Sequence, residues 1–153
     1  MPRLITAAVT LIWGFAGIAM ISCEQSPTVP SHVGTVDQLV QSLRGQGLAV
    51  SLGGEISPND NGFFSVPARK VSIDGQRLSA FEYATAERAA ADAALISVDG
   101  QPNPRAAITW VSTPRFYRQG RLIVLYVGCA TEVIAALEQS LGPPIVTGPT
   151  PCR

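Results

Sequence analysis

The sequence predicts an α+β domain, a two-layer sandwich with helices packed on a mainly antiparallel sheet of four or five strands. Three observations support this prediction. Asp74-Gly75 between two β-rich runs is a strong hairpin signal, because a type I′ turn needs positive φ at both central residues. Thr35 and Thr85 each precede a helical pattern as N-cap candidates. The run 122–127 is apolar without alternation, as expected of a strand that is covered on both faces, or that meets helices on one face and a partner on the other.

The first half of the domain predicts one helix and three strands. Thr35 and Gln38 form a capping-box pattern, and apolar residues follow at helical spacing until Gly45 and Gly47. Residues 48–52 alternate as in a half-buried strand, and residues 68–73 and 76–83 flank the Asp-Gly turn. Hairpin links imply antiparallel pairing.

The second half predicts a helix, two strands and a final helix. The helix runs from Thr85 to Leu95 and is rich in alanine, which favours close packing on a sheet. Strands are expected over 106–112 and 121–127. The last helix is expected to use Thr131 as N-cap and to end at Gly142, before two prolines. The helices must bury their apolar sides on the sheet, and the later part is expected to be ferredoxin-like.

Composition excludes several classes of function. Eleven basic and eleven acidic side chains cancel, so no electrostatic footprint for nucleic acid is present. The chain has one histidine, His32, and one lysine, Lys70. No zinc spacing, phosphate loop, dinucleotide fingerprint or nucleophile elbow occurs, so neither a metal nor a cofactor is expected. CxxC is also absent, which argues against redox catalysis.

The N-terminus predicts export. Arg3 is the only charge before Glu24, and an apolar run occupies residues 4–21. Met20-Ile21-Ser22-Cys23 resembles the lipobox of bacterial lipoproteins. The resemblance implies a signal peptide over residues 1–22, cleavage before Cys23, and a diacylglyceryl group on its thiol with further acylation, palmitate being a typical chain. The alternatives are ordinary cleavage to a free secreted protein and an uncleaved anchor.

The mature chain then divides into three parts. Residues 23–34 are expected to be the lipidated cysteine and a flexible tether, because this segment is polar and proline-containing and has no apolar period. His32 lies in it, as a solvated linker residue. Residues 35–146 are the predicted α+β domain, and 147–153 its C-terminal tail.

Much of the mature chain resembles a group of small bacterial lipoproteins with no assigned activity. The strings FFSVPARKVSIDGQRLSAFEYAT and ITWVSTPRFYRQGRLIVLYVG carry the resemblance, together with the final ALEQSLGPP helix. It extends over residues 47–144. The resemblance supports the lipid anchor and the fold class, and it implies no catalytic residues.

The two remaining cysteines are candidates for a disulfide. Cys129 follows the last long strand, and Cys152 lies in the tail. Export places both in an oxidising compartment, where two thiols usually pair. The segment 142–151 spans about 30 Å when extended, enough to return along the last helix. The alternative is a buried free Cys129 beside a disordered tail.

One surface is a candidate for contact with a ligand or partner. Arginines and aromatic residues cluster around the second hairpin, and arginine binds phosphate and carboxylate and stacks on aromatic rings. The alternative is a solvated hairpin tip whose arginines discourage edge pairing. Phe63-Phe64 is expected to dock into the core, with an exposed contact as the alternative. The candidate surface consists of Trp110, Arg115, Phe116, Tyr117, Arg118 and Arg121.

The sequence thus predicts a lipid-anchored cell-envelope protein with its domain outside the cytoplasm, in the periplasm or at the cell surface. The leading function is non-enzymatic: binding an envelope protein or a small ligand, or a structural role. The alternative is an envelope enzyme with a carboxylate- or arginine-based site. A deep cavity with convergent ionisable groups would favour the enzyme, whereas a flat apolar patch or an unpaired sheet edge would favour binding.

Overall fold

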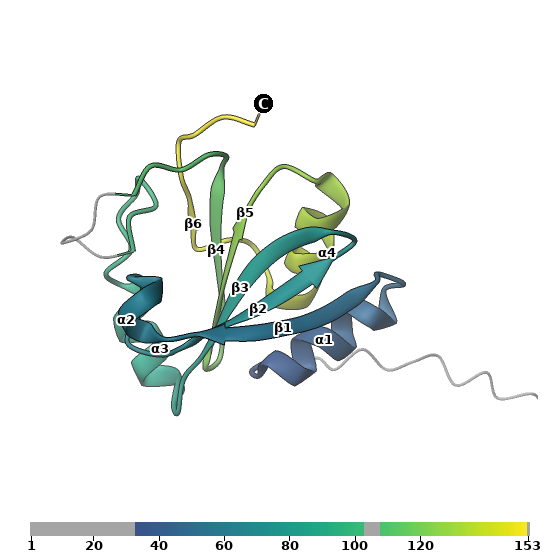
Figure 1. Cartoon of the computed structure of the whole chain (residues 1–153), viewed down its shortest axis with the longest axis horizontal. Coiled ribbons are helices and arrows are strands. Elements are labelled where there is room, and N and C mark those ends of the chain that lie inside the picture. Colours follow the sequence, from purple (N-terminus) through teal and green to yellow (C-terminus); the bar gives the residue numbers. More distant parts are fainter. Residues whose placement is uncertain (1–32, 103–107, 153) are drawn as a thin grey trace, which may run out of the picture.

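A computed structural model describes residues 33–102 and 108–152 and shows an α+β fold (Figure 1). Six antiparallel strands form one sheet in the order β1-β2-β3-β5-β4-β6, so the sheet has more strands than predicted. The elements are α1 (Val36–Gly45), β1 (Val50–Ile56), α2 (Pro58–Asn61), β2 (Ala68–Ile73), β3 (Gln76–Glu82), α3 (Ala86–Ala93), β4 (Pro114–Gln119), β5 (Leu122–Val127), α4 (Thr131–Leu141) and β6 (Val146–Thr147).

Helices cover both faces of the sheet. The long helices α1 and α4 lie on one face, called here the first face, and α2 and α3 lie towards the other, the second face (Figure 1). Neighbouring residues of a strand point to opposite faces. Tyr117 therefore belongs to the core under α4, while Phe116 belongs to the core on the second face. The central strand β5 is buried on both faces, as its non-alternating sequence predicts.

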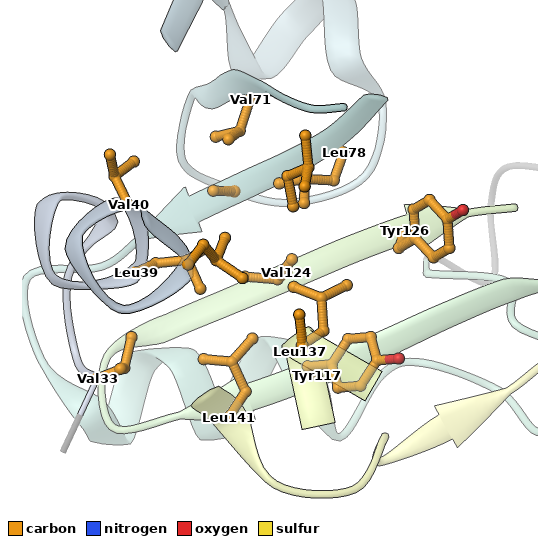
Figure 2. Packing of buried hydrophobic residues seen from close by; sticks show 14 of the residues in the cluster. Val33, Leu39, Val40, Val71, Leu78, Tyr117, Val124, Tyr126, Leu137 and Leu141 are labelled. Carbon is orange, nitrogen blue, oxygen red and sulfur yellow. The ribbon is translucent and has the colours of Figure 1, made fainter. Parts of the chain in front are cut away.

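The first core is built between the sheet and the helices α1 and α4 (Figure 2). Leu39 of α1 and Leu137 of α4 are fully buried against Val124 and the ring of Tyr117. The two helices are also joined by a 2.8 Å hydrogen bond between the Oγ atoms of Ser42 and Ser140. All the described side chains of this core come from residue 33 onward, so the chain that follows Cys23 contains them and is expected to fold on its own.

The second core is smaller and lies under α3 and the loop that precedes β2. Phe81 of β3 and Ile123 of β5 form its floor, and Ala89 of α3 packs on it. Phe64 closes it, with its ring centroid 4.7 Å from that of Phe81 in an edge-to-face arrangement. Phe64 docks inward because the Oδ1 of Asn61 accepts hydrogen bonds from the backbone N–H groups of Phe63 and Phe64.

Local signals in the sequence predicted most of these elements. The Oγ1 of Thr35 accepts a hydrogen bond from the N–H of Gln38, and that of Thr85 accepts one from Arg88. Asp74 has a φ of 48° and Gly75 one of 81°, and the two residues form the turn between β2 and β3. Both caps and this hairpin are therefore confirmed.

Two local predictions were wrong. The expected strand over 106–112 is replaced by β4, which begins at Pro114; residues 103–107 lie outside the described part. A tight turn at Gly120, with a φ of 53°, pairs Gln119 directly with Leu122. The strand therefore continues up to this turn and lies later in the sequence than predicted. The last helix begins at Thr131, with Ala130 as its N-cap and no side-chain capping bond. The N–H of Ala130 instead donates to the hydroxyl of Tyr126.

The later part of the fold matches a ferredoxin-like arrangement only locally. The units β3, α3 and β4 form a crossover, with β5 inserted between the two strands. Two features differ: α3 and α4 lie on opposite faces, and β6 pairs with β4 at the edge of the sheet. Strand β3 has β5 on one side and β2 on the other, because the Asp74-Gly75 hairpin pairs β2 with β3.

Both ends of the described chain are attached to the domain. Val33, expected in the tether, is only 1% exposed and packs in the first core. The tail pairs with β4 through β6, and the N–H of Gly148 donates to the carbonyl of Pro114. A disulfide joins Cys129 to Cys152, with their Cα atoms 5.6 Å apart. Across residues 33–102 and 108–152, no helix has the length and apolar character needed to span a membrane.

Candidate functional site

The second face of the sheet carries a groove that α3 leaves uncovered. Helix α3 and the loop before β2 that contains Phe64, called here the Phe64 loop, cover the cross-strand pair formed by Ala68 and Phe81. The next two cross-strand pairs on this face, Lys70 with Ser79 and Ser72 with Arg77, have no helix above them. Together with part of β1 and β5 they form a groove of about 690 Å³. We call it the open groove. Its lining is Ser51, Leu52, Gly53, Ile56, Phe63, Lys70, Val71, Ser72, Arg77, Leu78, Ser79, Trp110, Val111, Leu125 and Val127.

One half of the open groove is polar and cationic. On β2 and β3, Lys70 pairs with Ser79 and Ser72 pairs with Arg77. All four side chains point to the second face, because their neighbours in the strands are buried in the first core. Serine hydroxyls and two cations are therefore the first groups that a ligand on this part of the sheet would meet.

The other half of the open groove is apolar. Leu125 and Val127 of β5 form its floor, and Trp110 stands beside them. The ring of Trp110 stacks on that of Phe63, with centroids 6.0 Å apart and an interplanar angle of 10°. Val111, 92% exposed, extends this apolar wall into solvent.

Strand β1 opens the groove at its edge. Its pairing with β2 shifts between Leu52 and Glu55, so Gly53 and Gly54 form an irregularity there. A Cβ on Gly53 would lie 3.0 Å from the Cβ of Lys70, a very tight contact. Glycine at this position therefore leaves space for the stem of Lys70.

The charge of the open groove is unbalanced. No aspartate or glutamate is among the described residues that line it, and neither Lys70 nor Arg77 forms an ion pair within the described part of the chain. Two other arginines differ: Arg69 binds Glu55 and Arg121 binds Glu82, each at 2.8 Å. The open groove thus combines two unneutralised positive charges with an apolar wall.

The arginines and aromatic residues predicted as a contact surface are distributed over both faces of the sheet. Phe116 and Tyr117 are fully buried in opposite cores. Arg115 donates a 2.6 Å hydrogen bond to the carbonyl of Gly128, and Arg121 is bound to Glu82. Arg118 lies on β4, partly exposed. Trp110 and Phe116 do meet, with their rings edge to face.

A second pocket of about 460 Å³ holds the carboxylates that an enzyme could use. It is lined by Glu55, Glu82, Arg69 and Arg121, among others. Glu82 both pairs with Arg121 and accepts a 2.9 Å hydrogen bond from the N–H of Val36 at the start of α1. These contacts give Glu82 a structural role as a helix cap. Both glutamates of this pocket are thus engaged by arginine.

Two buried tyrosines have shifted pKa values. Burial raises the pKa of Tyr83 well above its ordinary range, and the hydrogen bond to Asp92 and the charge of that carboxylate act in the same direction. The pKa of Tyr117 is raised to about 12, first by burial and then by the charge of Glu138, against the opposing charge of Arg115. Tyr83 lines the second pocket, and its hydroxyl is bound to Asp92. Tyr117 lines neither that pocket nor the open groove, so its shift concerns stability.

The sequence pattern had not pointed to Lys70, Arg77, Ser72 and Ser79 as a site. Polar residues that alternate with apolar ones in a strand usually form a solvated face. The usable signal was that Lys70 is the only lysine of the chain and that no acidic side chain alternates with it in β2. Trp110 was predicted as part of a contact surface, and it lines the open groove. Its stacking on Phe63 was not predicted, because Trp110 was expected inside a strand.

Within residues 33–102 and 108–152, no three His, Cys, Asp or Glu side chains are placed to share a metal ion. Comparison of the chain with family models, curated proteins and solved structures finds no match. The function must therefore be argued from the site itself.

Proposed function

We propose that this chain is a lipid-anchored cell-envelope protein whose α+β domain is a non-enzymatic binding module for a small ligand. The anchor is Cys23, supported by the apolar run before it and by the likeness of Met20-Ile21-Ser22-Cys23 to a lipobox. The domain lies outside the cytoplasm, which is consistent with its disulfide.

The observation that carries the binding function is the amphipathic lining of the open groove. Its volume of about 690 Å³ is within the range of small-molecule sites, and apolar walls with a few convergent polar groups are typical of them. The groove offers cations and hydroxyls without a carboxylate among its described lining residues. Such a lining favours holding a ligand over acid–base catalysis by a carboxylate.

The alternative, an envelope enzyme, would use the second pocket. Two of its three carboxylates, Glu55 and Glu82, are each held by an arginine at 2.8 Å, and the third, Asp37, lies in the first turn of α1. To act in catalysis, either glutamate would have to leave its arginine, and Glu82 would also release the first turn of α1. The binding function needs no such rearrangement.

Amide chemical-shift mapping tests the choice between the two sites. Residues 24–153, labelled with ¹⁵N and with the disulfide formed, are titrated with a set of small amphipathic compounds. We expect shifts to concentrate at Ser72, Ser79 and Val127. Shifts concentrated at Glu82 and Arg121, or none at the open groove with any compound, would overturn the proposed binding surface.

A further inference from the structure

The two halves of the open groove differ in chemistry and lie side by side. From their arrangement we infer that the groove takes a single-chain lipid anion, that is, a hydrocarbon chain ending in a carboxylate or a phosphate. This inference rests on the proposed binding function and names the ligand class. The head group would lie at Lys70 and Arg77, and the chain would lie along Val127 and Trp110.

Lys70 and Arg77 are placed to share one oxyanion. Lys70 is opposite Ser79 and Arg77 is opposite Ser72, so the two cations are diagonal neighbours on adjacent strands. Diagonal neighbours on one face of an antiparallel pair are roughly 7–8 Å apart, a separation that one carboxylate or phosphate can bridge. The two positive charges repel each other when the groove is empty, and an anion between them removes that repulsion. The hydroxyls of Ser72 and Ser79 can donate further hydrogen bonds to it.

The apolar half lies next to this cationic pair, on the side of β5. The cationic pair lies on β2 and β3, and the next strand, β5, is one strand interval, or roughly 5 Å, further across the groove. A hydrocarbon chain that starts at the cationic pair therefore reaches the apolar half within a few carbon–carbon bonds. Trp110, stacked on Phe63, provides a flat apolar side against which such a chain can pack.

Other ligand classes leave part of the groove unmatched. A neutral apolar segment would cover two cations without neutralising them, which costs desolvation energy. Free phosphate would use the cations but leave the wall of Trp110, Val111 and Val127 in water. A cationic amphiphile would meet charge repulsion. Only a molecule that joins an anion to a hydrocarbon chain satisfies both halves.

Calorimetric titration of residues 24–153 tests the ligand class, with every probe below its micellar concentration. Dodecanoate and dodecyl phosphate are expected to bind, and the difference between them tells a fatty-acid head group from a phosphate one. Dodecyltrimethylammonium and inorganic phosphate are expected not to bind measurably. Shortening the carboxylate series from dodecanoate to decanoate should weaken binding by about fourfold per methylene.

Matched variants test the residues. Lys70→Gln with Arg77→Gln should weaken dodecanoate binding by about tenfold or more, since each exposed ion pair contributes up to about fivefold. The control Arg88→Gln removes an exposed arginine of α3 that does not line the groove, and its affinity should be unchanged. The charge-conserving Lys70→Arg with Arg77→Lys should keep most of the binding. Near-ultraviolet circular dichroism verifies that each variant is folded.

The single lysine gives an independent measure of position. Lys70 carries the only lysine amine of the chain, so acylation at that site is read by mass spectrometry of one peptide. Dodecanoate should slow acylation of Lys70, and dodecyltrimethylammonium should not. Equal affinity for both dodecyl compounds, or unchanged affinity in the double glutamine variant, would overturn the lipid-anion inference but leave the groove as a binding site. Absence of any groove shift in the amide mapping would overturn both.

Discussion

The hydroxyl of Tyr83 donates a 2.9 Å hydrogen bond to the Oδ2 of Asp92. The same carboxylate oxygen accepts bonds from the N–H and the Oγ of Ser65. Asp92 therefore ties the end of β3 and the Phe64 loop to α3. Because α3 is short and rests on few large side chains, this contact decides how much of the second face it covers, and so where the open groove begins.

Replacing Tyr83 by phenylalanine should destabilise the domain by about 1.5–3 kcal/mol, the usual value of a hydrogen bond to a charged group. The ring of Tyr83 is 1% exposed, so the variant keeps its packing and loses only the hydroxyl. Urea unfolding followed by circular dichroism measures the change. A free energy of unfolding equal to that of the wild type would contradict the role given to Asp92.

Tyr117→Phe is the matched control, and its effect should be near zero or slightly stabilising. The hydroxyl of Tyr117 is buried and meets no hydrogen-bond partner among the described residues. Removing a buried polar group that has no partner breaks no hydrogen bond and removes the free-energy penalty of its desolvation. A loss as large as that of Tyr83→Phe would show that this hydroxyl has a partner after all.

Alkaline pH should destabilise the protein through Tyr117. Its pKa is about 12 in the folded state and near 10 in the unfolded state, so folding favours the protonated form. This contribution is fully present below pH 10 and is lost as the pH rises through 12. Its size is up to about 3 kcal/mol for a shift of two units.

Urea unfolding between pH 8 and 12 measures this contribution in the wild type and in Tyr117→Phe. The wild-type stability should fall more steeply above pH 10 than that of the variant, while the two remain parallel below it. Parallel curves over the whole interval would mean that Tyr117 does not titrate with a raised pKa in the folded protein.

The disulfide should stabilise the domain by roughly 3 kcal/mol. Cys129 and Cys152 are 23 residues apart, and closing a loop of this length removes about that much unfolded-state entropy. The double variant Cys129→Ser with Cys152→Ser should lose this stability. Reductant should destabilise the wild type to the same extent and leave the variant unchanged.

Hydrogen exchange shows where the disulfide acts. The N–H groups of Ile145 and Gly148, which bond to the carbonyls of Phe116 and Pro114, should exchange faster in the double serine variant. Amides of β5, in the centre of the sheet, should follow only the change in global stability. Unchanged protection at Gly148 would mean that the tail is held by its backbone pairing alone.

Membrane attachment should depend on Cys23. Several acyl chains, at about 0.8 kcal/mol per buried methylene, hold a protein on a bilayer essentially permanently. Cys23→Ala removes the attachment point and should move the mature domain to the soluble fraction, together with loss of labelling by palmitate. Retention of the mature domain in the membrane fraction would contradict the lipid anchor.

The elements that the sequence predicted well are those defined by contacts within a few residues. Thr35 and Thr85 cap their helices with N–H groups three residues away, and Asp74-Gly75 closes a two-residue turn. The run 122–127 is apolar on both faces, and such a strand has to be central. These features depend on local backbone conformation and on side-chain period, both of which can be read along one strand or helix.

Long-range packing decided the rest. Trp110 was expected in a strand, but it stacks on Phe63, 47 positions earlier, and no local pattern encodes that contact. The face that carries Lys70 and Arg77 could have been covered or open, and this depended on how far α3 and the Phe64 loop reach along the sheet. Burial is a property of the assembled layers, so a site made by incomplete coverage becomes visible only when the layers are in place.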